Sequence, residues 1–432
     1  MSKQIFAGFE YPAGHKHRLI ERKRYEVAPG VHVFYGYSGS NFSAIIGPDG
    51  WILVDTGSSV EGAKMAVEEI ATLTDKPLAA IIMTHSHPDH RGGGAVFLEG
   101  KGADFPVWGR SNFGAEMAGF KGLEKIAARR GGRQFGAGIP DSKYTPNVMV
   151  PRFDYGETPG APFLPTRFLD GAELKLDIAG VRVELYAAPG ETQDHMAVWL
   201  PGSSVLFTGD NMYRSFPNIY PVRGAGFRDL GTWAATLRRL ADFPSRAVVF
   251  GHNEPVCPGC GQEDGPTMLR NYAEAIQFVL DASLGGINDG LTPDELAASL
   301  RLPEHLRQLP YLGEFYGSVP WAVRSVFAGM LGWFDGNASN LVTLQPKDEA
   351  ARMAELAGGA GALLGKAKTA LESGDYPWAA KLADYVRLCG SAAEISEASL
   401  LKADALEKLS EIVMPISGKN YLIASALELR AI

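Results

Sequence analysis

Four side chains that commonly bind metals stand close together in one short segment, which reads HSHPDH at residues 85–90. Zinc and similar divalent cations take imidazole nitrogen and carboxylate oxygen at about 2.0 to 2.2 Å, so their ligands must converge from one tight loop and from distant points of the chain. His85 and His87 alternate in an extended segment and can point to the same side. Asp89 and His90 follow the proline turn and can serve a second, neighbouring metal. One loop can therefore begin two metal sites.

The residues around this segment have the pattern of a mixed sheet. Residues 31–55 alternate the β-rich runs VHVFYGY, FSAIIG and WILVD with breaks such as SGSN and GPDG, which predicts hairpin strands. Residues 58–73 have the periodicity of an amphipathic helix, and the run AAIIM at 79–83 predicts a short buried strand. Strand, helix and strand thus bring the histidine-rich loop to a sheet edge. Glycines at 92–94 allow the following helix to approach closely.

Further strands are predicted in the middle of the chain, after one irregular region. We expect a helix over residues 112–129 and then an irregular Gly- and Pro-rich stretch over 131–165. A loop of this length usually covers a functional site. A second helix is expected over 230–241. The predicted strands are 173–178, 181–187, 196–200, 205–207 and 247–250.

The texture of the sequence changes to helices after about Pro266. Thr292 and Glu295 have the spacing of a capping box and predict a helix start. From about Gln345 onward, long Ala- and Leu-rich segments predict successive helical hairpins. An all-α region is therefore expected to follow the β-rich one.

Composition excludes several classes of function. A chain of 432 residues with 46% hydrophobic residues can bury at least one large core, and a net charge of −8 provides no general attraction for nucleic acid or an anionic membrane. The first residues contain no apolar stretch that could serve as a signal peptide or membrane span, so we expect a cytoplasmic protein. Three cysteines are too few for a disulfide framework, and we expect Cys257 and Cys260 to form a reduced turn, although a cross-link or a third metal is also conceivable.

The remaining metal ligands must come from later in the sequence. Glu191 in APGET, Asp210 in VLFTGD and His252 in VVFGH each follow a predicted strand. The Asp210 carboxylate could bridge two cations about 3.5 to 4 Å apart, as two-metal hydrolysis requires. His195 competes with Glu191, but we expect it to lie behind the ligands or to face solvent. Together with the four side chains of the HSHPDH loop, Glu191, Asp210 and His252 make seven candidate metal ligands.

The chain resembles the metallo-β-lactamase superfamily. VDTG at 54–57, THSHPDH at 84–90, TGD at 208–210 and GH at 251–252 occur in the usual order of that superfamily. The resemblance implies an α+β fold, an αββα sandwich with two metals at one edge between its sheets. At 190–192 the sequence reads Gly-Glu-Thr where much of the superfamily has Gly-His-Thr, so a carboxylate would replace an imidazole at the first metal.

That replacement and two later segments resemble the alkylsulfatase branch of the superfamily. The segments are YGSVPWAVRSVFAGMLGWFDGNASNL at 316–341 and NYLIASALEL at 420–429. The resemblance implies a helical dimerisation domain after the sandwich, and hence a homodimer. We therefore expect a catalytic domain over 1–285 and a helical dimerisation domain over 286–432.

The resemblance also implies roles for individual residues. Arg223 matches the sulfate-binding arginine of the branch. Asp210 departs from the branch, which commonly has glutamate at the bridging position. The sterol-carrier-like domain that usually follows has no counterpart in this sequence, which makes long-chain substrates a weaker expectation. The implied zinc ligands are His85, His87 and Glu191 at one ion, Asp89, His90 and His252 at the other, and Asp210 between them.

These residues lead to a hypothesis of zinc-dependent sulfate ester hydrolysis. Two Zn²⁺ ions per chain, or another divalent metal, would lower the pKa of a bridging water, held at Asp210, from about 15.7 towards 7. A planar guanidinium suits a sulfate monoester better than an ammonium, which points to Arg223 and Arg228. The apolar part of a small anionic ester could meet side chains of the irregular loop or of the helical region. Examples from these parts of the chain are Phe216, Tyr220 and Trp321.

Three alternatives stay open at the level of sequence. A metal pair that generates hydroxide would also suit a phosphodiester, a lactone or a thioester. A carboxylate-containing site could instead hold iron for oxygen chemistry. Finally, the helical tail could make the chain an interaction scaffold, although a scaffold has no need for a complete set of metal ligands.

Overall fold

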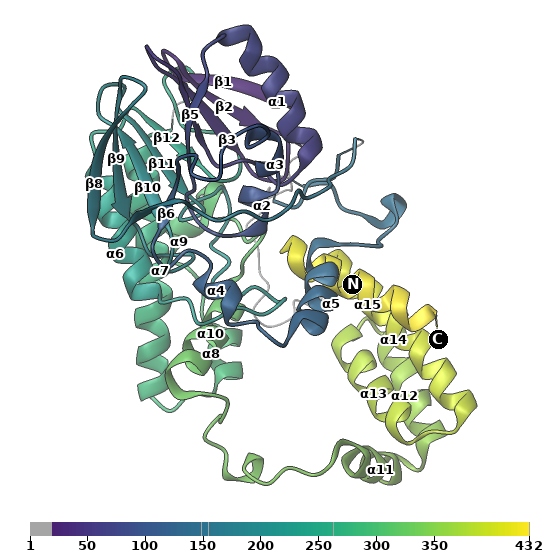
Figure 1. Cartoon of the computed structure of the whole chain (residues 1–432). Coiled ribbons are helices and arrows are strands. Elements are labelled where there is room, and N and C mark those ends of the chain that lie inside the picture. The colour runs from purple at the N-terminus through teal and green to yellow at the C-terminus, as the bar shows by residue number, and fades with distance from the viewer. Residues whose placement is uncertain (1–19, 148, 154, 262, 432) are drawn as a thin grey trace.

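Two β-sheets lie face to face in the N-terminal part of the computed structural model, with helices on both outer faces (Figure 1). The structure describes residues 20–147, 149–153, 155–261 and 263–431. One sheet has seven strands in the order β1-β2-β3-β4-β5-β6-β7, and the other has five in the order β12-β11-β10-β9-β8. An all-helical region follows. The predicted α+β fold, an αββα sandwich followed by helices, is confirmed.

The first sheet contains the strands expected around the histidine-rich loop. Its first four strands are antiparallel neighbours, whereas β4, β5, β6 and β7 run parallel to one another. Three strands were not predicted, namely β1, β6 and β7, because their sequences KRYEVA, VWGR and RFL mix polar and apolar residues over short lengths. The bounds are β1 Lys23–Ala28, β2 Val31–Tyr35, β3 Phe42–Ile46, β4 Trp51–Val54, β5 Leu78–Ile82, β6 Val107–Arg110 and β7 Arg167–Leu169.

All five strands of the second sheet were predicted. Strands β10 and β11 are buried along their whole length, because one face packs on the first sheet and the other is covered by helices. Both therefore read as continuous apolar runs. The edge strand β8 instead alternates exposed and half-buried residues. The bounds are β8 Glu173–Ile178, β9 Val181–Ala187, β10 Met196–Leu200, β11 Val205–Gly209 and β12 Ala247–Phe250.

Three apolar layers hold the sandwich together. Val33 and Ile52 of the first sheet pack with Val198 of the second between the sheets. Helices α1 (Val60–Leu73) and α3 (Gly94–Phe97) cover the outer face of the first sheet, and α6 (Leu230–Ala241) and α7 (Gly265–Asn288) cover that of the second. The side-chain oxygen of Ser59 accepts from the backbone N–H of Gly62 and caps α1. In α6, the apolar face buries Trp233 completely.

The histidine-rich loop leads into the short helix α2 (Pro88–Arg91), which lies close to the start of α1. A Cβ atom at Gly92 would lie 1.9 Å from the carbonyl oxygen of Ser58, and one at Gly93 would lie 2.1 Å from that of Thr56. Real side chains cannot approach so closely, so glycine is required at both positions. The predicted close approach after the loop is therefore confirmed.

The helix expected over residues 112–129 is wrong in its extent. The structure has two helices, α4 (Ala115–Ala118) and α5 (Glu124–Phe135), separated by a turn. Gly122 has φ +86°, a left-handed conformation that a continuous helix does not contain. The irregular stretch expected over 131–165 begins later than predicted, because α5 continues to Phe135. Beyond α5, the described residues up to 165 are irregular apart from the 3₁₀ turn η1 (Asp141–Lys143).

The first helices after the sandwich belong to its outer layer. Helix α8 (Pro293–Ser299) begins with the predicted capping box of Thr292 and Glu295. It packs with α10 (Val319–Leu331) against α7, in the same apolar core as α6. The predicted domain boundary at 285/286 falls inside α7 and stays a prediction. Between α8 and α10 lie α9 (Glu304–Arg307) and the 3₁₀ turn η2 (Pro310–Leu312).

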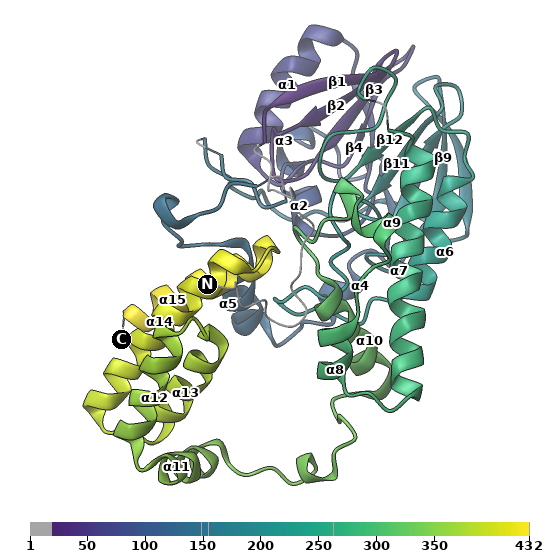
Figure 2. The same ribbon diagram turned by 180° about the vertical axis from the view of Figure 1, so that it is seen from behind.

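A separate helical bundle forms the C-terminal part, after an extended connector that contains η3 (Ala338–Asn340) (Figures 1 and 2). The predicted helical hairpins are confirmed. The last helix lies beside α5, where the Glu428 carboxylate accepts hydrogen bonds from the Arg133 guanidinium. The bundle comprises α11 Pro346–Ala357, α12 Ala360–Glu372, α13 Tyr376–Cys389, α14 Ala392–Ile412 and α15 Ile416–Arg430.

The two cysteines of the CPGC turn differ from expectation. Cys257 and Cys260 form a disulfide, and their Cα atoms are 5.1 Å apart, within the range that a disulfide spans. The expected reduced turn is therefore wrong, because the turn brings the two side chains together. Among the described residues, no helix has the length and apolar character needed to cross a membrane.

Candidate metal centre and its cavity

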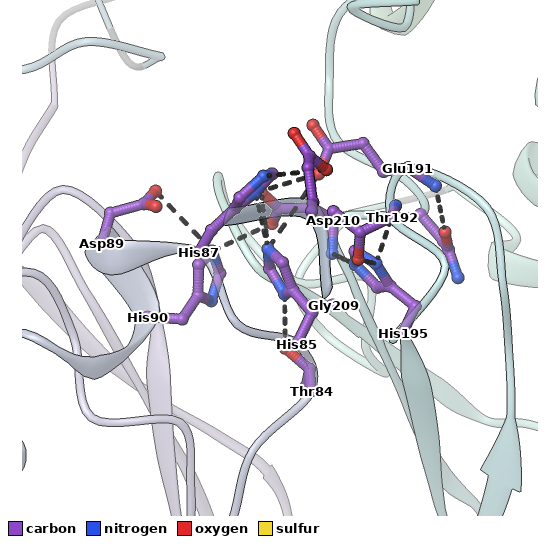
Figure 3. A network of polar contacts seen from close by, with 12 residues as sticks. Thr84, His85, His87, Asp89, His90, Glu191, Thr192, His195, Gly209 and Asp210 are labelled. Carbon is purple, nitrogen blue, oxygen red and sulfur yellow. Dashed lines mark hydrogen bonds and ion pairs between the residues drawn. The ribbon is translucent and has the colours of Figure 1, made fainter. Parts of the chain in front are cut away.

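The candidate ligands gather at one edge of the sandwich, where several strands end. The loop after β5 supplies the histidine-rich segment, Glu191 follows β9, Asp210 follows β11 directly, and His252 follows β12. Figure 3 shows Glu191 and Asp210 facing the histidines of the loop. Both sheets therefore contribute, which explains how residues from 85 to 252 meet at one place.

The seven predicted ligands form two groups that share Asp210. Within each group, one potential ligand atom from every residue lies within 4.8 Å of the others. All but Asp89 are buried, and the Asp89 side chain is 40% exposed. The groups are His85, His87, Glu191 and Asp210, and Asp89, His90, Asp210 and His252.

The histidines of this centre are held in fixed orientations. His90 Nδ1 lies 2.9 Å from Asp55 Oδ2, and His252 Nδ1 lies 2.9 Å from the Gly39 carbonyl oxygen. His85 Nδ1 lies 3.0 Å from Thr84 Oγ1. Histidines that ligate metals generally donate the N–H of the other ring nitrogen to such an oxygen. Their Nε2 atoms thus point into the site.

Several buried atoms of the centre have no hydrogen-bond partner. Among the described residues, His90 Nε2, Glu191 Oε2 and Asp210 Oδ1 are buried and unpartnered. Native proteins pair nearly all buried polar atoms, so such a cluster calls for a ligand. Imidazole nitrogen and carboxylate oxygen are the donors that zinc accepts, and the residues present therefore fit two divalent cations.

Asp55 is a contributor that sequence reasoning did not single out. Its carboxylate accepts from the Thr84 backbone N–H at 2.8 Å and from the Thr84 hydroxyl at 2.7 Å, besides contacting His90. Its backbone has φ +56°, which is uncommon for a residue other than glycine. The VDTG motif contains this residue, but its role depends on contacts that only the folded chain brings together.

His195 lies behind the ligands, which was one of the two expectations for it. Its ring stacks on that of His85 with 4.0 Å between centroids. The backbone N–H of Asp210 donates to its Nε2 at 3.2 Å, and Thr192 Oγ1 lies 2.6 Å from its Nδ1. Both ring nitrogens are therefore occupied. Because His195 is fully buried, the alternative of a solvent-facing residue is wrong.

Negative charge is concentrated at the centre. Burial alone would lower the pKa of His252, but Asp210 and Asp89 outweigh it and raise the pKa to about 10. Burial would raise the pKa of Glu191, yet the charge of Arg228 and then that of His87 outweigh it and lower the pKa. The carboxylates thus favour positively charged neighbours, and a divalent cation bound here would meet the same preference.

A cavity of about 1300 Å³ opens onto the ligands and changes character along its length. At one end it is lined by the metal-ligand candidates together with Arg223 and Arg228. Elsewhere α4, α5 and the irregular stretch that follows supply a mostly apolar lining, with the charged Lys121, Glu124, Arg152 and Glu157 among it, so that stretch covers the site as expected. Its apolar lining includes Phe120, Ala127, Ala128, Phe135, Ile139, Met149 and Val150.

The two candidate arginines differ in their surroundings. Arg228 is buried, and its guanidinium donates to Glu191 Oε1 at 2.6 Å and to the Asn218 carbonyl at 2.7 Å. Arg223 is more open, with a side chain 19% exposed, and its guanidinium donates to the Gly224 carbonyl at 3.1 Å. Arg223 is therefore freer to bind a ligand.

Three aromatic residues suggested for the apolar subsite do not line the cavity. Phe216 belongs to the core behind the second sheet, and Trp321 lies on α10. Tyr220 is 37% exposed and is not part of the cavity lining. The expectation fails because α5 and the segment after it fill that side of the site. Glu116 on α4, which sequence reasoning also missed, lies near His87.

Comparison with known proteins agrees with this architecture. Residues 35–252 match the metallo-β-lactamase superfamily, and residues 292–431 match the alkyl sulfatase dimerisation family. A linear primary-alkylsulfatase of Pseudomonas sp. (strain ATCC 19151) is 33% identical over 390 residues, covering 88% of this chain and 72% of that protein.

Two further comparisons agree with the first. An (R)-specific secondary-alkylsulfatase of Pseudomonas sp. is 29% identical, over 94% of this chain and 62% of its own length. The solved structure of a stereoselective inverting sec-alkylsulfatase from Pseudomonas sp. superimposes with a TM-score of 0.84 at 28% identity, over 95% of this chain and 66% of that one. The chain belongs to the metallo-β-lactamase superfamily and, within it, to the alkylsulfatase family of metal-dependent hydrolases.

Proposed function

We propose that this protein is a binuclear zinc hydrolase that cleaves sulfate monoesters of alkyl alcohols to alcohol and inorganic sulfate. The observation that carries the proposal is the two-part cavity, with cation ligands and arginines at one end and an apolar wall at the other. An alkyl sulfate has the same two parts, a single anionic head and an apolar chain. The similarity to a primary-alkylsulfatase and to a secondary-alkylsulfatase supports the same substrate class.

The residues of the polar end have distinct tasks in this reaction. When bound, two zinc ions would polarise the ester oxygens and bring the pKa of water towards about 7. Asp210 belongs to both ligand groups and would hold the two ions at a fixed separation. Arg228 holds the Glu191 carboxylate in its ionised, ligating form through the 2.6 Å hydrogen bond. Arg223 would bind the sulfate oxygens through its guanidinium N–H groups.

The apolar end would bind the alcohol part and keep water away from it. Each buried methylene of a bound chain would contribute about 0.8 kcal/mol, so affinity should rise with chain length until the wall is filled. The wall combines side chains of α5 with Met149 and Val150 of the irregular stretch, all of which line the cavity. Lactones and simple thioesters lack the anionic head, whereas a phosphodiester has one, so the assay must separate it from a sulfate ester.

The test is a panel of substrates assayed in parallel with the metal content known. Alkyl sulfates of increasing length, an aryl phosphate diester, a lactone and a thioester are compared at equal enzyme concentration. We expect release of inorganic sulfate from alkyl sulfates with KM falling as the chain lengthens. Preferential turnover of another ester, or mainly iron in the protein with no sulfate release, would contradict the proposal. Reaction in water labelled with heavy oxygen places the label in the alcohol after attack at carbon and in sulfate after attack at sulfur.

We also propose that the protein is a homodimer through its helical part. The connector and the start of the bundle expose large apolar side chains, with Trp333 76%, Val342 87% and Leu356 83% exposed. Exposed apolar groups in one region often mark a protein–protein interface, and this region lies inside the match to the dimerisation family. Mass in solution at micromolar concentration should correspond to two chains, and Trp333→Ser with Val342→Ser should shift it to one. A monomeric wild type would contradict this.

A further inference from the structure

Glu116 lies between two side chains of the candidate site, those of His87 and Arg223. Its Oε2 is 3.7 Å from His87 Nε2, and its Oε1 is 3.9 Å from Arg223 Nη2. The Glu116 side chain is only 13% exposed. Within the described part of the chain, His87 Nε2 and Glu116 Oε1 are buried atoms without a hydrogen-bond partner. A buried carboxylate thus faces a ligand of the metal centre on one side and the arginine that binds anions on the other.

His87 differs from the other histidines of the centre in the nitrogen that it presents. Its Nδ1 lies 3.2 Å from Glu191 Oε2 and 3.0 Å from His85 Nε2, so Nδ1 is the atom that faces the first ligand group. This leaves Nε2 as the nitrogen that needs an outer partner. The other histidines have Asp55, Gly39 and Thr84 in that position, whereas His87 has Glu116.

The segment that carries Glu116 is tied to the turn that carries Glu191. The backbone N–H of Gly114 donates to Asp194 Oδ2 at 2.9 Å, and the Asn112 side-chain amide donates to the Gln193 carbonyl at 3.1 Å. These bonds fix the start of α4 relative to the residues just after Glu191. The position of Glu116 beside His87 is therefore set by the same turn that places a ligand of the first group.

We propose that Glu116 is a positioning residue with two partners: one oxygen accepts the His87 Nε2–H and aims Nδ1 at the first metal, and the other orients Arg223 towards the sulfate. The proposal rests on the proposed zinc chemistry.

Two substitutions separate the two tasks. Glu116→Gln keeps an oxygen that can accept from His87 but removes the charge that orients Arg223. Glu116→Met has a similar volume and provides neither. We use Glu184→Met as the matched control, because Glu184 has a side chain 10% exposed, is paired with Arg182, and lies on β9 away from the cavity.

The first measurement is the zinc affinity of each site, by competition between the metal-free protein and a chromophoric chelator. Loss of an outer partner typically lowers metal affinity about 10- to 100-fold. We expect a loss of this size at one of the two sites in Glu116→Met, a loss of less than about threefold in Glu116→Gln, and wild-type affinities in the Glu184→Met control. Thermal unfolding followed by circular dichroism establishes that each variant is folded.

The second measurement separates KM from kcat for an alkyl sulfate. Glu116→Gln should raise KM while leaving kcat and zinc content near wild type, and Arg223→Ala should raise KM less in the Glu116→Gln background than in the wild type. Wild-type zinc affinities in folded Glu116→Met would overturn the inference, as would strictly multiplicative effects on KM. A wild type that binds zinc but releases no sulfate would overturn the proposed function instead, and leave the zinc measurement to decide the role of Glu116 at His87.

Discussion

The sandwich edge and the C-terminal bundle bury polar groups in opposite ways. At the edge, imidazoles and carboxylates are packed together, and each of His90, Glu191 and Asp210 has a buried atom that lacks a hydrogen-bond partner. In the bundle, the core consists largely of alanine and leucine, and charged residues such as Lys402 and Asp384 pair at the surface. Over residues 346–430, which the structure describes throughout, the one buried side-chain nitrogen or oxygen without a hydrogen-bond partner is Asn420 Oδ1, at the contact with α5.

This difference indicates where each region obtains its stability. The bundle is stabilised by contacts that its own sequence supplies. The edge gathers buried ligand atoms that lack hydrogen-bond partners, so bound cations would contribute part of its free energy of unfolding. A functional centre of this kind thus depends on its ligands, whereas the neighbouring bundle does not.

Metal removal should destabilise the sandwich edge and leave the bundle unchanged, which is the largest difference that we expect between the two regions. A ligand present at about 1,000 times its dissociation constant stabilises the folded state by about 4 kcal/mol per site, so a strong chelator should remove about that amount from the sandwich. We expect amide hydrogen exchange measured by mass spectrometry to quicken in β11 and β12 and to stay unchanged in α13. Equal quickening in both regions would contradict the assignment of metal-dependent stability to the edge. Sulfate release should cease and return when zinc is restored.

Removing the partner of a buried carboxylate should also act on the edge alone. Arg228→Met leaves Glu191 buried without its 2.6 Å ion pair, which typically costs about 3 to 5 kcal/mol of stability. Chemical denaturation of the metal-free protein measures this cost. The matched control is Arg182→Met, because Arg182 pairs with Glu184 but has a side chain 63% exposed, and its loss should cost less than about 1 kcal/mol. Equal costs for the two variants would show that burial at the edge does not matter.

A cavity in the bundle should have the converse effect. Leu364 is buried in the core of α12, α13 and α14, and Leu364→Ala should cost about 2 to 5 kcal/mol in that region. Zinc stoichiometry and kcat of the folded enzyme should stay at wild-type values, because the core of the bundle contributes no residue to the metal centre. Loss of bound zinc in the folded variant would mean that the two regions are coupled.

The smallest expected effect lies at the contact between the regions. Hydrogen bonds from Arg133 lower the pKa of Glu428 to about 2, below the unfolded value of about 4.3. A carboxyl with a lowered pKa stabilises the fold above the unfolded pKa and loses that effect as pH falls through the folded one. Because the side chain is 41% exposed, Glu428→Gln should cost only about 0.5 kcal/mol at pH 7. The difference from wild type should shrink between about pH 5 and pH 2, and a constant difference would contradict the pairing.

The same two regions show how far sequence reasoning extends. Long periodic segments predicted the bundle helices and α6, and continuous or alternating apolar runs predicted the second sheet, since local pattern and final burial agree there. The short strands β6 and β7 were missed because their strand conformation depends on parallel neighbours from distant parts of the chain. The helix over 112–129 was wrong in its extent because Gly122 adopts a left-handed conformation that interrupts it, and the sequence pattern does not mark that conformation.

The site was predictable where ligands occur in motifs and not where they act through tertiary contacts. The spacing of the HSHPDH loop and the strand ends led to seven residues that the structure brings together. Asp55 contacts His90, which is 35 residues away, and Glu116 lies near His87, which is 29 residues away. No local pattern marks Glu116 as different from any surface glutamate. The apolar lining was misplaced for the same reason, because the path of α5 was unknown.

Titration of zinc into metal-free protein tests most directly whether two zinc ions in this centre drive sulfate ester hydrolysis. Zinc bound per chain and the initial rate of sulfate release from an alkyl sulfate are measured in the same samples. We expect saturation of binding at two zinc ions per chain, with activity that rises with occupancy and is absent without metal. Sulfate release by metal-free protein, or full zinc occupancy without any sulfate release, would contradict it.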